Sequence, residues 1–167
     1  MLTISSNRLG DRLKQYWLLA RFDKPIGILL LLWPTLWGLW LSSSGSPNIY
    51  VVVIFVMGVV LMRSAGCVMN DFADRNFDGH VERTRDRPLP AKKISPREAL
   101  LLAAGLAGIA FGLVYQLNAL TVRLSFFALA LAIIYPFLKR VFWLPQAWLG
   151  VAFGFGLPMA FAAQQNV

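Results

Sequence analysis

Residues 50–78 read YVVVIFVMGVVLMRSAGCVMNDFADRNFD, an apolar run that leads without a break into a cluster of acidic residues. Residues 50–69 alone supply twenty positions. At about 1.5 Å per residue, such a helix crosses a hydrocarbon core of about 30 Å. A helix satisfies its own backbone hydrogen bonds, which lipid cannot do. This stretch therefore predicts a transmembrane helix that carries an Asp-rich segment at one end.

Four more apolar segments have lengths suited to helices. With 57% hydrophobic and 14% charged residues, the chain is too apolar for a domain surrounded by water. Short polar segments separate the apolar ones, so we predict an all-α, multi-pass transmembrane bundle of about five spans, with residues 1–167 forming a single domain. The other predicted spans are residues 26–41, 99–117, 119–138 and 146–163.

Residues 1–24 differ from the spans because five Lys and Arg residues are scattered among their apolar positions. Apolar residues recur there at helical spacing, which is typical of a short helix lying at an anionic membrane surface. A solvated tail is the alternative. No compact apolar core precedes a small-residue cleavage site, so we predict no cleaved signal peptide. The apolar positions are Leu9, Leu13, Tyr16, Trp17 and Ala20.

Lys and Arg residues are unevenly distributed, and this sets the predicted orientation. Residues 1–24 contain five and residues 70–97 contain seven, whereas residues 42–49 contain none. Cytoplasmic loops of membrane proteins carry the excess of Lys and Arg. We therefore expect the N-terminus and the 70–97 segment to be cytoplasmic. The same distribution explains the net charge of +8 without nucleic-acid binding.

Acidic residues are concentrated, since five of the eight lie between residues 71 and 86. Asn70, Asp74 and Asp78 are spaced by four, which would place them on one face of a continuing helix. Oxygen groups gathered in this way repel one another unless a cation lies between them, and they suit Mg²⁺ that also binds a substrate diphosphate. The alternative is a helix end whose acids pair with neighbouring arginines.

Basic residues near this cluster are candidates for binding a diphosphate. Arg83 and Arg87 directly follow the acids, and an Arg fork binds two phosphate oxygens at once. Arg63 lies inside the apolar run, where an arginine is costly unless it faces a polar cavity or a partner. Tyr135 and Lys139 are four apart at the end of the fourth apolar segment and could reach the same cavity, although ordinary snorkelling also accounts for Lys139.

Several motifs together resemble a known family. The chain resembles the UbiA superfamily of intramembrane aromatic prenyltransferases in NDFADRNFD at 70–78, GHVERTRDRPL at 79–89 and YPFLKR at 135–140. It is similar in particular to the 4-hydroxybenzoate polyprenyltransferases of ubiquinone biosynthesis in DKPIG at 23–27, LPQ at 144–146 and PMAFAA at 158–163. The resemblance implies a multi-pass protein of the bacterial inner membrane.

That resemblance also implies a reaction and a set of site residues. Mg²⁺ would assist the departure of diphosphate from a polyprenyl diphosphate, and the prenyl group would join the carbon ortho to the hydroxyl of 4-hydroxybenzoate. Asp71, Asp74 and Asp78 would be the catalytic carboxylates, and Asn70, Asp74 and Asp78 would hold Mg²⁺. The substrate-binding residues would be Arg63, Asn70, Arg83, Arg87, Tyr135, Lys139 and, more weakly, Lys24.

One departure from the family concerns length. The resemblance implies nine helices and a second Asp-rich motif, whereas this sequence predicts about five spans and one such motif. We therefore expect an N-terminal portion that lacks full activity alone, with a C-terminal half or another copy as its partner. The alternatives are a different aromatic acceptor, such as a naphthoate or a porphyrin, a cation-binding membrane transporter, or an inactive fragment.

Overall fold

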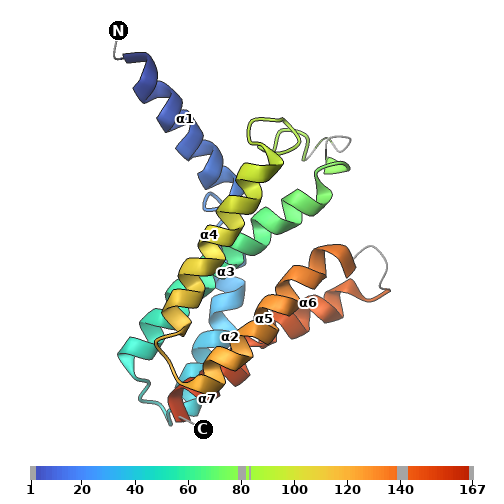
Figure 1. Cartoon of the computed structure of the whole chain (residues 1–167). Helices are drawn as coiled ribbons and strands as arrows, with labels where there is room; N and C mark the ends of the chain where they lie inside the picture. The colour runs from blue at the N-terminus through green and yellow to red at the C-terminus, as the bar shows by residue number, and fades with distance from the viewer. Residues whose placement is uncertain (1–2, 79–81, 83, 139–142, 166–167) are drawn as a thin grey trace.

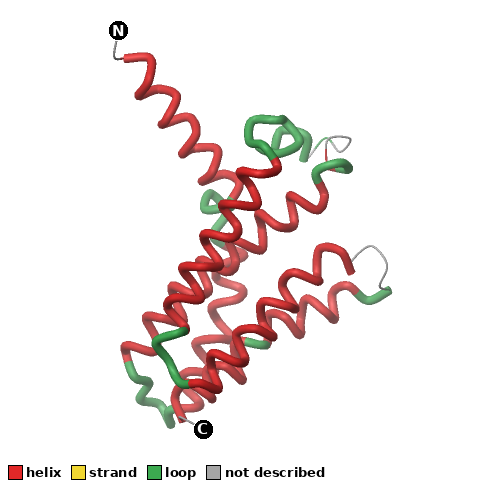
Figure 2. The backbone as a smooth tube through the Cα atoms, in the orientation of Figure 1, coloured by secondary structure: helices red, strands yellow, loops and turns green. Residues whose placement is uncertain are grey.

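The computed structural model describes residues 3–78, 82, 84–138 and 143–165, with side chains from Leu9 onward. Every regular element in this part of the chain is a helix (Figures 1 and 2), which confirms the predicted all-α class. The helices are α1 (Thr3–Leu19), α2 (Ile26–Ser42), α3 (Ile49–Asp74), α4 (Pro96–Val114), α5 (Ala119–Leu138), α6 (Pro145–Gly154) and α7 (Gly156–Gln165).

The helices α3, α4 and α5 are long and apolar enough to cross a membrane, and α6 and α7 together cover a fourth such segment, Pro145–Gln165. The apolar helix α2 is 17 residues long and thus shorter than the other crossing segments. Residues 21–25 do not extend it, because Arg21 has a positive φ of 61° and the chain turns there. The predicted multi-pass architecture is therefore confirmed.

Two predicted spans differ from the observed helices. The segment 146–163 is divided into α6 and α7 rather than continuous. Pro158 explains this division, because a proline ring clashes with a helical carbonyl four residues earlier, here that of Gly154, where α6 ends. The helix predicted over 50–69 is longer at its acidic end, since α3 continues to Asp74.

A capping box at the start of α4 also fastens α1 to the bundle. The Ser95 hydroxyl accepts a hydrogen bond from the Glu98 N–H, and the Glu98 carboxylate accepts one from the Ser95 N–H. This arrangement satisfies two backbone donors that the helix leaves free. Glu98 Oε1 also accepts hydrogen bonds from Arg12 at 2.8 Å and from the Tyr16 hydroxyl at 3.2 Å. Beyond this contact, α1 diverges from the other helices (Figure 1).

The apolar positions of α1 differ in how closely they pack on the bundle. Tyr16 contacts α4, and Ala20, just beyond the helix, is buried. Leu9, Leu13 and Trp17 are each more than half exposed, at 64%, 58% and 55%. The short helix expected in this segment is therefore present as α1, and its position at a membrane surface stays a prediction.

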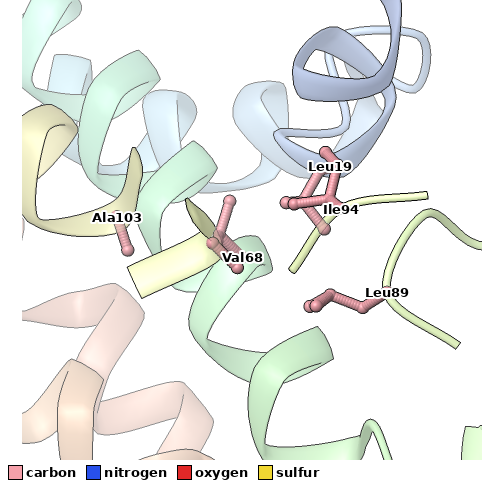
Figure 3. Packing of buried hydrophobic residues seen from close by; sticks show 6 residues of the cluster. Leu19, Val68, Leu89, Ile94 and Ala103 are labelled. Atoms are coloured by element: carbon pink, nitrogen blue, oxygen red, sulfur yellow. The ribbon is translucent and has the colours of Figure 1, made fainter. Parts of the chain in front are cut away.

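A buried apolar cluster holds the segment after α3 against the bundle (Figure 3). Leu19 at the end of α1, Val68 of α3 and Ala103 of α4 belong to this cluster together with Leu89 and Ile94 of the connecting segment. All five are at most 6% exposed. Removal of this apolar surface from water fixes the connecting segment beside α3.

Candidate active site

A cavity of about 440 Å³ lies among helices α2 to α7. Apolar side chains form most of its lining, among them Phe55, Phe111 and Phe153. The charged lining residues come from the C-terminal half of α3 and from segments before α2 and after α3, so they gather toward one end of the bundle (Figure 1). These residues are Arg21, Arg63, Asp71 and Arg87, joined by the polar residues Asn70 and Tyr135.

The most buried charged group of this end is Asp71, which is 1% exposed. Its Oδ1 accepts hydrogen bonds from Arg21 Nη2 at 2.9 Å and from Arg87 Nη1 at 3.1 Å. Arg87 Nη1 also donates to Asp78 Oδ2 at 2.8 Å. A buried carboxylate is strongly destabilising unless it is paired, so Asp71 brings two distant arginines to the cavity wall. Its position is that of an organising residue between these arginines.

Asn70 and Asp74 lie one helical turn apart, as the spacing predicts, and Asn70 Nδ2 donates to Asp74 Oδ2 at 3.3 Å. Asp78 does not share their face, because α3 ends at Asp74 and a turn follows in which the Phe77 N–H donates to the Asp74 carbonyl. The expectation of one continuing helix is therefore wrong. No three His, Cys, Asp or Glu side chains converge as a metal site within the residues that the structure describes.

The structure accounts for the remaining predicted residues in three ways. Arg63 and Tyr135 line the cavity, as proposed from the sequence. Arg83 and Lys139 lie outside the described residues. Lys24 is exposed and does not belong to the cavity lining. The sequence did not identify Arg21 as a site residue, because the positive N-terminal segment already accounted for its charge. Its ion-pair partner Asp71 is 50 positions away, so local spacing gives no sign of the contact.

The comparison with known families decides what this fold is. The sequence pattern of the UbiA prenyltransferase family matches residues 31–167. The chain belongs to the UbiA prenyltransferase family. Two curated relatives, from Nitrosospira multiformis and Thiobacillus denitrificans, are each named 4-hydroxybenzoate octaprenyltransferase and are each 67% identical to it. Each match includes 93% of this chain but 54% and 53% of those proteins, so the chain spans about half their length.

Two solved structures of UbiA homologues share the fold. The apo structure of the homologue from Aeropyrum pernix K1 is 31% identical, with a TM-score of 0.73 over 83% of this chain and 50% of that one. The homologue from Archaeoglobus fulgidus, solved with GPP and Mg²⁺, is 17% identical, with a TM-score of 0.76 over 90% of this chain and 54% of that one. The resemblance to the UbiA superfamily inferred from the motifs is thereby confirmed.

The Asp71 network yields a prediction about stability. Asp71→Asn removes the charge that both arginines share, and a broken buried ion pair destabilises a protein by on the order of 3 kcal/mol. Asp86→Asn is the matched control, because Asp86 is exposed and such surface changes stay within about 0.5 kcal/mol. The free energy of unfolding of each variant is measured in detergent micelles. Equal stability of the two would contradict the organising role of Asp71.

Proposed function

We propose that the chain acts in the transfer of a polyprenyl group from a polyprenyl diphosphate to the carbon ortho to the hydroxyl of 4-hydroxybenzoate, a step of ubiquinone biosynthesis. The observation that carries the proposal is the cavity, which combines an apolar interior with a cationic end. The names of the relatives at 67% identity support the choice of acceptor.

The cationic end suits the diphosphate of such a substrate. When the bond between the prenyl carbon and oxygen breaks, negative charge develops on the departing diphosphate. Cations held in advance near those oxygens stabilise that charge without reorganising, and Arg forks match phosphate oxygens in pairs. Arg21 and Arg87 are held by Asp71, and Arg63 lines the same cavity. We assign these three arginines to diphosphate binding.

The oxygen-bearing side chains beside them suit Mg²⁺. Asn70 and Asp74 offer adjacent hard oxygen ligands on α3, and Asp78 lies within reach of the same arginine as Asp71. Few protein ligands suffice, because Mg²⁺ keeps several waters and also binds substrate phosphates. Asn70, Asp74 and Asp78 would hold the ion, which when bound would neutralise charge on the departing diphosphate. The presence of GPP and Mg²⁺ in the Archaeoglobus fulgidus homologue supports this assignment.

The apolar part of the cavity suits the prenyl chain and the reaction that follows. Once diphosphate departs, the allylic carbon carries positive charge, and water would capture it. Side chains from six helices keep this region apolar, and a closed apolar site limits such side reactions. Tyr135 lies in the same lining, and we assign it to the substrate site next to the aromatic acceptor.

A chimaera tests the function directly. This chain would replace the matching 54% of the Nitrosospira multiformis relative, and membranes containing the chimaera would receive octaprenyl diphosphate, radiolabelled 4-hydroxybenzoate and Mg²⁺. We expect labelled octaprenyl product and its loss on chelation of Mg²⁺. Asp74→Asn should lower the rate by roughly 10- to 100-fold, because the metal would lose a charged ligand.

The control for this assay is Asp11→Asn, which removes an exposed carboxylate on α1 and should leave the rate unchanged. Product with a different aromatic acceptor alone would refute the assignment of 4-hydroxybenzoate. An inactive chimaera beside an active parent relative would refute the proposed function of this chain.

We also propose that the cationic end of the bundle faces the cytoplasm, with α1 on the membrane surface and its exposed apolar residues toward lipid. The opposite end supports this orientation, since amides and hydroxyls connect its turns. Tyr50 donates to Gln116 at 2.6 Å and the Asn48 N–H to Gln164 at 3.3 Å. An excess of Lys and Arg marks the cytoplasmic side, and Trp17 suits the interface.

Cysteine labelling tests this orientation. In a Cys67→Ala background, Ser46→Cys should react with a membrane-impermeant maleimide in intact cells, because the turn after α2 would face outward. Lys93→Cys should react only after the membrane is made permeable. Both positions are exposed, so access to water is matched. The reverse pattern would mean that the bundle is inserted the other way round.

A further inference from the structure

Gly27 and Arg63 make a close contact between α2 and α3, in which a side chain at position 27 would force the Arg63 guanidinium to move. A Cβ atom on residue 27 would lie 2.5 Å from Arg63 Nη2, 2.7 Å from Nε and 3.0 Å from Cζ. Ordinary contacts of a Cβ atom begin at about 3.4 Å. The guanidinium therefore occupies the space that any other side chain at position 27 would need.

No carboxylate of the described residues forms an ion pair with Arg63 there. Its Nη1 donates to Cys67 Sγ, a weak acceptor, and its Nε is buried with no hydrogen-bond partner in the described part of the chain. The described ion pairs include Arg21 and Arg87 but not Arg63. The nearby first turn of α2 presents backbone N–H groups and the positive end of the helix dipole, which do not attract a cation. Local pairing thus does not explain the position of this guanidinium.

We propose that Gly27 is a positioning residue, whose missing side chain leaves the notch that holds the Arg63 guanidinium at the cavity for the substrate diphosphate. This inference rests on the proposed function, because it assigns the uncompensated charge of Arg63 to a substrate anion. The inference extends the site to the DKPIG segment at 23–27, none of whose residues lines the cavity. Gly27 would act on the site only through its contact with Arg63.

An alanine at position 27 would displace the cation. The guanidinium is planar and rigid, so Nη2, Nε and Cζ must move together by about 1 Å to restore ordinary contact with the new Cβ. Misplacement of a binding group by about 1 Å can reduce function on the order of 100-fold. Lysine at position 63 keeps the charge on a flexible chain and has no counterpart of Nη2, the atom nearest to the new Cβ, so an alanine at 27 should then cause less crowding.

The experiment is a double-mutant cycle on the purified chain, with wild type, Gly27→Ala, Arg63→Lys and the double variant. One readout is the melting temperature in detergent, which requires no ligand. The other is the dissociation constant of radiolabelled geranyl diphosphate with Mg²⁺. Gly105→Ala is the matched control, because Gly105 is also helical and a Cβ there meets nothing within 4 Å.

We expect Gly27→Ala to weaken geranyl diphosphate binding at least tenfold and to give none of the rise in melting temperature that alanine, the better helix former, usually brings, because the Arg63 side chain must move. In the Arg63→Lys background the same change should have little effect on binding and should raise the melting temperature, as alanine in a helix usually does, and Gly105→Ala should leave binding unchanged. Additive effects of the two substitutions would overturn the proposal. Coupling in stability without coupling in binding would overturn the positioning role.

The failure of the proposed function would look different from these outcomes. If the wild-type chain did not bind geranyl diphosphate, diphosphate recognition by this chain would be refuted, and with it the assignment of Arg63 to the substrate. The stability cycle would still decide separately whether Gly27 and Arg63 share one space.

Discussion

The buried charge of Asp71 is the constraint on which the cationic end of this bundle depends. A carboxylate at the end of a membrane helix is tolerated only when cations neutralise it. Here the cations come from residue 21, before α2, and residue 87, well after α3. The ion pairs with Asp71 therefore hold two chain segments against α3 and place both arginines on the wall of one cavity.

The ion pairs alone do not supply the stability of this arrangement, because the loss of hydration offsets much of the attraction between buried charges. Apolar burial supplies it instead. Leu89 and Ile94 lie on either side of the turn that follows Arg87, and both are buried against α1, α3 and α4. The apolar cluster holds the connecting segment on the bundle. The ion pairs of Arg87 determine the position at which that segment lies along α3.

Much of the architecture was predictable because lipid admits few backbone solutions. The helix predicted over 119–138 has the observed bounds of α5. The errors arose where tertiary or local backbone effects intervene. The last span is interrupted near Pro158, whose effect is local. By contrast, α3 ends at Asp74, and Asp78 beyond it pairs with Arg87, a contact that spacing does not reveal.

The candidate site was predictable in its residue types more than in its pairings. Spacing correctly joined Asn70 to Asp74, since neighbours on a helical face follow from geometry. It gave no information on Arg21, because long-range partners leave no trace in local periodicity. Asp71 was therefore grouped with the other acids, although its burial gives it a different position from theirs.

The depth of the charges along α3 relates the fold to the chemistry of its proposed substrate. Arg63 precedes Asn70 by seven residues, which is about 10 Å along a helix, so the cationic lining continues inward past the acids. A prenyl diphosphate has the same polarity, with a charged head and an apolar tail. With its head between Asn70 and Arg63, its tail would begin where the lining becomes apolar. Arg63 would thus lie at the boundary between the diphosphate head and the prenyl tail. Its contact with Gly27 of α2 would determine how far inward the charged head could lie.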